Sequence, residues 1–333
     1  MKVPKKKIFI IILSVLALLA ILYEIVLHIS FATPGTVYGV TFDSEYAGYL
    51  QLNPVEVLST ILNDWHFRYI RIGVHWNKVE PTNGNFNFSE FDTYMAMAAS
   101  SSAHMMLAIG QKTPRWPECH LPDWARKLSP DQYRAALLAY ITATVEHYKN
   151  NPALESWQVE NEPFLAFGAN CPGFTVADLQ QEIALVKKLD PNHPIMVGDS
   201  GELATWLHTA DAGDLFGTTM YHIVWNPLFG YFSYDWLPAA YYRFKLWLMH
   251  RSPESTYVIE LQAEPWVTNT EISKMPLSQQ YKSMNINLLK KNIAYADSIG
   301  LPRVYLWGAE WWYWVKVKKG VPDFYNFAAQ LNR

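Results

Sequence analysis

The sequence predicts an α/β protein, a (β/α)8 TIM barrel preceded by one N-terminal transmembrane helix. Two observations carry this prediction. A long apolar run follows a cluster of lysines at the start of the chain, and short strand-like runs then alternate with helical patterns eight times. Eight such units over about 300 residues fit a (β/α)8 barrel. A doubly wound open sheet is the structural alternative, but the chain has no G-x-G-x-x-G motif and no Walker loop.

The N-terminal segment has the composition of a membrane-spanning helix. Four lysines precede an apolar run from Ile8 to Leu27, which is interrupted only by Ser14 and Glu24. Twenty helical residues are about 30 Å long, which matches the hydrocarbon core of a bilayer. The lysines favour a cytoplasmic N-terminus, so the rest of the chain is expected outside.

These signals divide the chain into two parts. We expect residues 1–30 to form the cytoplasmic lysines and a signal-anchor helix that contacts the membrane through residues 8–27. Residues 34–333 are expected to form one extracytoplasmic barrel domain. A cleaved signal peptide with Ser30-Phe31-Ala32 as its cleavage site is the alternative, and it would give a secreted protein.

The predicted strands are four to six residues long and mostly apolar, as parallel strands covered by helices are. They are Val37–Phe42, Tyr69–Val74, Met105–Ile109, Glu155–Val159, Ile195–Gly198, Phe216–Tyr221, Tyr257–Leu261 and Arg303–Trp307.

Capping signals predict the helices between the strands. The predicted helices are 55–64 after Asn53-Pro54, a helix from Ser129-Pro130 to Tyr148, one from Thr175 to Leu189, and a long helix at 277–298 that ends at Gly300.

Composition excludes several classes of protein. With 50% hydrophobic and 15% aromatic residues, and 17% charged, the chain is not disordered. The formal charge is -3, and it is -6 without the N-terminal lysines and Glu24, so no basic excess exists for binding nucleic acid. The pairing of the two cysteines, Cys119 and Cys171, stays open. The 14 tryptophans either fill the core or form flat platforms for a ring-shaped ligand.

Acidic residues follow two of the predicted strands. The fourth strand continues into Glu160-Asn161-Glu162-Pro163, and the seventh carries Glu260 at its end. The catalytic residues of (β/α)8 barrels lie at the carboxyl ends of strands, so these carboxylates face one another across the barrel mouth. Two facing carboxylates are what glycosidic cleavage needs. This chemistry needs no metal, and we expect no metal or other cofactor.

These residues resemble clan A of the retaining glycoside hydrolases, which contains cellulase-like, mannanase-like and β-glycosidase barrels. The resemblance implies that Glu162 is the acid/base, that Glu260 is the nucleophile, and that Asn161 binds a sugar hydroxyl. It also implies an arginine on strand two that keeps the nucleophile ionised, an aromatic residue on strand six, and a tryptophan on strand eight under the sugar. Those residues are Arg71, Tyr221 and Trp307.

Two assignments are less direct. Glu264 has the same strand parity as Glu260 and competes for the role of nucleophile, but Glu260 follows the β-rich run directly and is preferred. Glu310, in the aromatic segment after strand eight, is predicted to contact substrate hydroxyls. Burial and the neighbouring Glu260 should raise the pKa of Glu162, as an acid catalyst requires.

The predicted function is therefore a membrane-anchored retaining glycoside hydrolase that cleaves a β-linked oligo- or polysaccharide by double displacement. Two alternatives stay open: a non-catalytic carbohydrate-binding barrel, and a transglycosylase that remodels envelope or exopolysaccharide. The sequence does not identify the sugar, its protein partners, or endo against exo action.

Overall fold

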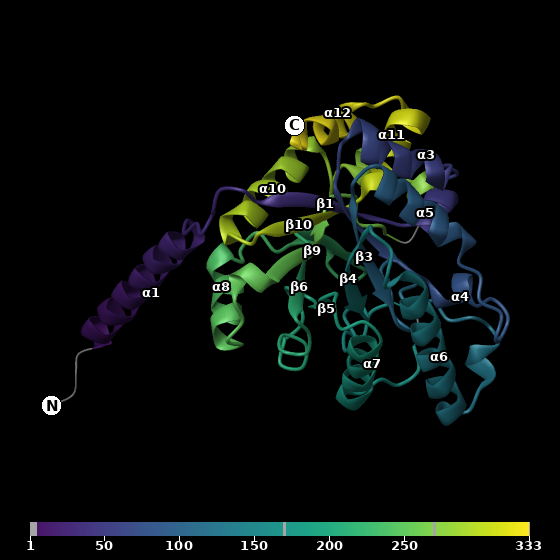
Figure 1. Cartoon of the computed structure of the whole chain (residues 1–333). Coiled ribbons are helices and arrows are strands. Elements are labelled where there is room, and N and C mark those ends of the chain that lie inside the picture. The colour runs from purple at the N-terminus through teal and green to yellow at the C-terminus, as the bar shows by residue number, and fades with distance from the viewer. Residues whose placement is uncertain (1–4, 169–170, 269–270, 333) are drawn as a thin grey trace.

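The computed structural model describes residues 5–168, 171–268 and 271–332. Eight parallel strands close a barrel in the order β1-β10-β9-β6-β5-β4-β3-β2, which confirms the predicted fold (Figure 1). The barrel strands are β1 (Val37–Phe42), β2 (Tyr69–Gly73), β3 (His104–Ile109), β4 (Leu154–Val159), β5 (Ile195–Asp199), β6 (Leu215–Met220), β9 (Thr256–Gln262) and β10 (Arg303–Trp307). Each lies within one residue of its predicted bounds. A separate hairpin, β7 (Ile223–Asn226) and β8 (Gly230–Ser233), follows β6.

Helices surround the barrel and bury its outer face. They are α2 (Ser44–Tyr49), α3 (Pro54–Ser59), α4 (Trp76–Val79), α5 (Ser89–Ser100), α6 (Pro130–Tyr148), α7 (Val176–Leu189), α8 (Ala239–Leu248), α9 (Leu277–Gln280), α10 (Ile286–Ile299), α11 (Ala309–Lys319) and α12 (Asp323–Leu331). The predicted caps form, since Ser129 and Thr175 each make a capping box and the Asn53 side chain accepts from the Val55 N–H.

Two helix predictions were wrong. The long helix predicted at 277–298 is split into α9 and α10, because the Asn285 side chain caps the N–H groups of Asn287 and Leu288 and starts a new helix. No helix connects β5 to β6, where residues 200–214 form turns. A Cβ on Gly201 would come within 2.1 Å of the Thr219 carbonyl oxygen, so only glycine fits where this segment passes β6.

Many of the tryptophans are buried in the hydrophobic core. Six of them, including Trp311 and Trp312 of α11, are among the largest fully buried side chains. The structure also shows whether the two cysteines pair, which the sequence left open. Cys119 and Cys171 form a disulfide with a Cα–Cα distance of 5.5 Å, which joins the loops after β3 and β4.

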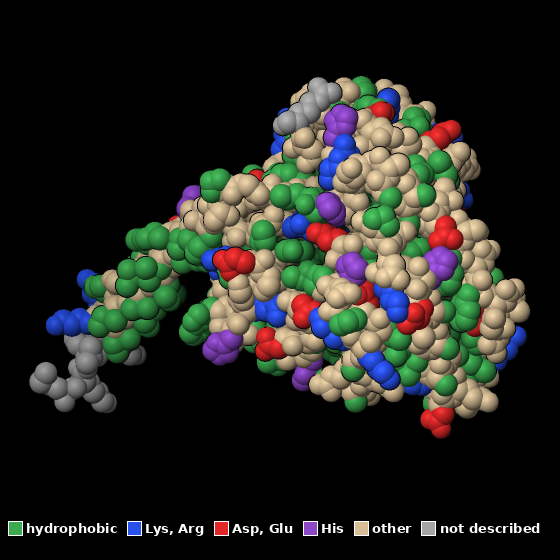
Figure 2. All heavy atoms as spheres, in the orientation of Figure 1, with side chains coloured by type: hydrophobic (Ala, Val, Ile, Leu, Met, Phe, Trp, Pro, Cys, Tyr) green, Lys and Arg blue, Asp and Glu red, His purple; other side chains and the backbone are tan. Residues whose placement is uncertain are grey.

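The N-terminal helix α1 (Lys5–Leu27) projects outward from the barrel, with its C-terminal end near α8 (Figure 1). Its residues Lys6–Leu27 are long and apolar enough to cross a membrane, and none of its most apolar 18-residue window is buried against the rest of the protein. In Figure 2 it is a projection covered with hydrophobic side chains. Length and composition alone do not separate an anchor from a signal sequence.

Candidate active site

A buried arginine joins the predicted site residues at the barrel mouth. Arg71, in β2, is fully buried, and its Nη1 donates to Glu260 Oε1 at 2.8 Å. Its Nη2 donates to Asn161 Oδ1 at 2.7 Å, and its Nε donates to Gln158 Oε1 at 2.6 Å. A buried guanidinium needs a counter-charge and partners for its N–H groups, and β4, the segment directly after it and β9 supply them.

Glu260 is held by partners on both of its oxygens. While Oε1 pairs with Arg71, Oε2 accepts from the Tyr221 hydroxyl at 2.7 Å. The register of β9 shifts against both of its neighbours around Ile259 and Glu260, as a β-bulge does. Bulges redirect side chains and often lie beside active sites. Burial, followed by the charge of Glu260, raises the pKa of the Tyr221 hydroxyl well above its usual value, so the tyrosine stays a donor.

Glu162 lies in the opposite electrostatic setting. It follows β4 in the left-handed backbone region, at a φ of 44°, and Thr219 donates to its Oε1 at 3.0 Å. Burial, with further contributions from the charges of Glu260 and Glu118, raises the pKa of Glu162 well above its usual value. The raised pKa favours the protonated form of Glu162, whereas Glu260 is paired with the cation of Arg71.

Glu118 is a third carboxylate of the site that the sequence did not reveal. It is buried, and its Oε2 accepts from Asn161 Nδ2 at 3.0 Å. Burial first, and then the charge of Glu260, raises the pKa of Glu118 to about 7. It lies in the loop after β3, next to the disulfide-bonded Cys119, and that pairing is the signal that could have placed it near β4.

Glu160 is hydrogen-bonded to the start of the same loop, directly after β3. Its two carboxylate oxygens accept from the N–H groups of Gln111 and Lys112 at 2.7 and 2.8 Å. Gly110 has a φ of 130°, and a Cβ there would come within 2.3 Å of Glu160 Oε1. Glu160 therefore supports the loop after β3. The Lys112 ammonium in turn donates to the backbone carbonyls of Glu162 and Leu165.

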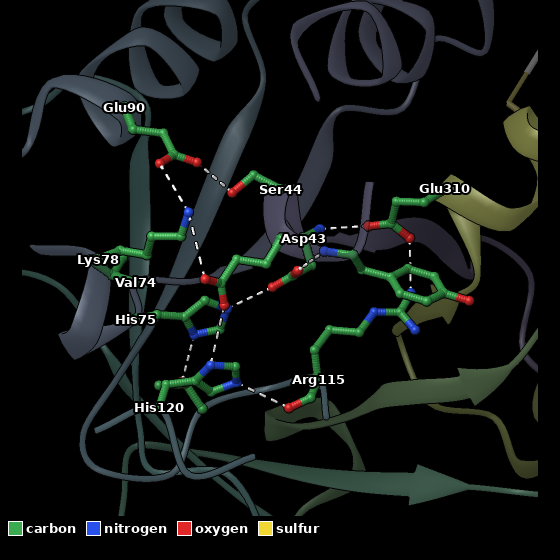
Figure 3. A network of polar contacts seen from close by, with 12 residues as sticks. Asp43, Ser44, Val74, His75, Lys78, Glu90, Arg115, His120 and Glu310 are labelled. Carbon is green, nitrogen blue, oxygen red and sulfur yellow. Dashed lines mark hydrogen bonds and ion pairs between the residues drawn. The ribbon is translucent and has the colours of Figure 1, made fainter. Parts of the chain in front are cut away.

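Arg115 contacts the other predicted substrate-binding residues. Its guanidinium lies 4.1 Å from the centre of the Trp307 ring and 4.0 Å from that of Tyr46. It pairs with Glu264. Through Nη2 it also pairs with Glu310 Oε2 at 2.8 Å (Figure 3). Glu264 therefore neutralises Arg115, outside the contacts that join Arg71 to Glu260.

Glu310 has no exposed surface in this arrangement. Its Oε1 accepts from the Asp43 N–H at 2.5 Å, and its Oε2 is held by Arg115. Burial raises the pKa of Glu310 to about 7. Trp307 keeps only a narrow exposed edge, at 7% of its surface. The structure thus brings Arg71, Asn161, Tyr221 and Glu260 into direct contact, and places Trp307 and Glu310 around Arg115 instead.

Three residues near this site have the composition of a metal site, Glu45, His75 and His120. Their geometry does not favour one. Both ring nitrogens of His75 have protein partners, Asp43 Oδ2 at 2.6 Å and Thr113 Oγ1 at 2.8 Å (Figure 3). The two imidazoles stack with their centres 3.6 Å apart, so their in-plane nitrogens do not converge on one point.

One protein family matches a part of the chain that contributes to this site. Residues 65–172 match the model of glycosyl hydrolase family 10. This segment contains Arg71, Glu118, Asn161 and Glu162, but ends before Glu260.

Curated relatives match over short segments. The endo-β-1,4-xylanase Xyn10C of Cellvibrio japonicus is 31% identical over 101 residues, which is 29% of this chain and 16% of the xylanase. The mannan endo-1,4-β-mannosidase F of Aspergillus fumigatus is 36% identical over 67 residues, which is 19% of this chain and 14% of the mannosidase. The chain thus covers less than a fifth of the length of these relatives.

Solved structures share the fold over most of the chain. The GH5_18 protein of Bifidobacterium longum superposes with a TM-score of 0.57 at 12% identity, covering 82% of this chain and 69% of that one. Xylanase 10B of Thermotoga petrophila superposes with a TM-score of 0.53 at 14% identity, covering 82% of each chain. These superpositions show the (β/α)8 fold alone. The match of residues 65–172 and the short curated relatives confirm the predicted resemblance to the clan A glycoside hydrolases.

Proposed function

We propose that the protein is a retaining glycoside hydrolase that cleaves a β-linked glycan, with Glu260 as nucleophile and Glu162 as acid/base. The observation that carries the proposal is the contrast between the two carboxyl groups. Glu260 is fixed by Arg71 and Tyr221, whereas burial and the charge of Glu260 raise the pKa of Glu162 and so favour its protonated form. Pairs of acids with such opposed environments divide the roles of base and acid.

The reaction would proceed by double displacement. Glu260 Oε attacks the anomeric carbon while Glu162 gives its proton to the leaving oxygen, and a glycosyl ester forms on Glu260. Esterification removes the negative charge of Glu260, which is one cause of the raised pKa of Glu162. Glu162 then ionises more readily and takes a proton from the water that releases the sugar.

The substrate class is proposed from the relatives. Their names describe action on β-1,4-linked xylan and mannan, so these two polymers come first in a panel with β-glucans and bacterial exopolysaccharides. We further propose that residues 1–30 anchor the barrel domain, residues 34–333, on the extracytoplasmic side of a membrane. The support is the apolar, unburied helix Lys6–Leu27 behind its lysines.

Variants of Glu162 test the division of roles. Glu162→Ala should stop turnover of polysaccharide, because no acid then protonates the leaving oxygen. On an aryl glycoside whose leaving group needs no proton, the same variant should still form the ester, and added azide should yield a β-glycosyl azide. Glu260→Gly should abolish both reactions. The assignment is wrong if either variant, Glu162→Ala or Glu260→Gly, cleaves both the polysaccharide and the aryl glycoside at the native rate.

A further inference from the structure

The barrel carries an exposed apolar surface beside α1. Four large side chains in and just before α8 are mostly exposed: Trp236 (53%), Phe244 (57%), Trp247 (68%) and Leu248 (51%). The last three lie at positions i, i+3 and i+4 and so share one face of the helix. The rings of Phe244 and Trp247 stack with their centres 5.7 Å apart. We call these four residues the α8 apolar face. Contiguous apolar surface of this kind marks interaction sites.

Specific contacts fix where α1 lies relative to this face. The Tyr23 hydroxyl donates to the backbone carbonyl of Trp236 at 2.5 Å, and α1 contacts α8. Figure 1 shows the two helices side by side. Beyond α1, the Phe31 N–H donates to the Ser298 carbonyl at 2.7 Å, and the Arg243 guanidinium lies 5.1 Å from the Phe31 ring centre. The chain is thus held to the barrel on both sides of the end of α1.

The length of α1 sets the depth of this contact. Its 22 residues from Lys6 to Leu27 extend about 33 Å, slightly more than a hydrocarbon core of about 30 Å. Tyr23 lies four residues before the end of the helix, about 6 Å along its axis. When α1 crosses a bilayer, Tyr23 and the Trp236 backbone that it contacts therefore lie at the lipid interface. Amphipathic helices rest on membranes at a similar depth, about 5–10 Å.

We propose that the α8 apolar face rests on the outer leaflet of the bilayer that α1 crosses. The barrel would then be held by one spanning and one interfacial contact, which fixes the direction in which the barrel mouth points. The residue types agree with this partner. Tryptophan is enriched at membrane interfaces, and two of the four residues of the α8 apolar face are tryptophans, Trp236 and Trp247. This inference rests on the proposed membrane anchoring by α1, and it does not depend on the glycosidase chemistry.

The test uses the full-length chain in vesicles of phosphatidylcholine and phosphatidylglycerol. Trp247→Cys carries an environment-sensitive fluorophore, and lipids with nitroxides at the headgroup or at a shallow acyl position act as quenchers. Val55→Cys in α3 is the control, since Val55 is exposed and α3 lies on the side of the barrel away from α1 (Figure 1). The native cysteines are joined to each other and do not react.

We expect lipid nitroxides to quench the probe at 247 several-fold more strongly than the probe at 55. Equal, weak quenching at both positions would overturn the proposal, because the face would then lie in water. Shielding of the probe at 247 from aqueous iodide without quenching by lipid would also overturn it, and would assign the face to a second copy of the chain. Phe244→Cys gives the same readout if Trp247→Cys does not fold. No substrate is involved, so either result leaves the proposed activity untouched.

Discussion

The ion pair between Arg71 and Glu260 is the contact on which the proposed chemistry depends most. Arg71→Met keeps most of the side-chain volume but removes the counter-charge from a carboxylate that is 3% exposed. Removing one partner of a buried ion pair costs about 3–5 kcal/mol, because the remaining charge is left uncompensated. Part of this cost falls on Asn161 and Gln158, which lose their donors as well.

The cost can appear in two ways. Either the folded state loses about 3–5 kcal/mol of stability, or Glu260 takes up a proton and stops acting as a nucleophile. The two are separated by measuring urea unfolding together with the rate of ester formation from an activated 2-fluoro glycoside. Arg71→Lys is the matched control, since it keeps the charge but loses the forked geometry, and it should fall between the native protein and Arg71→Met. Native stability together with a native labelling rate in Arg71→Met would refute the reasoning.

Four further predictions concern neighbouring residues. Tyr221→Phe removes one charge-assisted hydrogen bond to Glu260, worth about 1.5–3 kcal/mol, so kcat/KM should fall roughly 10- to 150-fold; a loss under about twofold would assign Tyr221 no role in positioning. Glu118→Gln removes a negative charge that raises the pKa of Glu162, so the alkaline limb of the pH–activity profile should move to lower pH; an unmoved limb would contradict this. The pKa of Glu118 is raised from its ordinary value of 4.5 to about 7 in the folded state, so the native protein should lose stability as the pH rises through this range. Chemical denaturation of Glu118→Gln should show a weaker loss of stability over the same range. Replacing Cys119 and Cys171 by serine opens a loop with a sequence separation of 52 residues, which should cost about 4 kcal/mol by loop entropy, measured by thermal unfolding against the native protein kept oxidised.

The parts predicted from sequence are those that local patterns determine. Mostly apolar runs of four to six residues defined all eight barrel strands, because a strand buried on both faces is mostly apolar. Residues at strand ends followed from the same pattern, so the contacts among Arg71, Asn161, Tyr221 and Glu260 could be expected. The break between α9 and α10 was missed because helical periodicity continues through it, while the Asn285 cap depends on the local backbone.

The missed residues lie in the loop after β3. Its conformation depends on contacts with distant segments, namely the disulfide to Cys171 and the hold of Glu160 on Gln111 and Lys112. Local sequence periodicity does not encode such contacts. The hydrogen bond between Glu118 and Asn161 and the stacking of Arg115 on Trp307 therefore could not be predicted from the sequence. Glu310 illustrates the same gap, since its position after strand eight was visible but its pairing with Arg115 was not.

Trapping of the proposed glycosyl ester tests the central claim most directly. The native protein is incubated with activated 2-fluoro glycosides of xylose, mannose and glucose, and the labelled peptide is identified by mass spectrometry. The proposed mechanism predicts one adduct, on Glu260, and no adduct in Glu260→Gln. An adduct on Glu264 would move the nucleophile to the rival carboxylate. No adduct with any of these sugars, in a protein that still binds the glycans, would contradict the proposed activity and favour a carbohydrate-binding barrel.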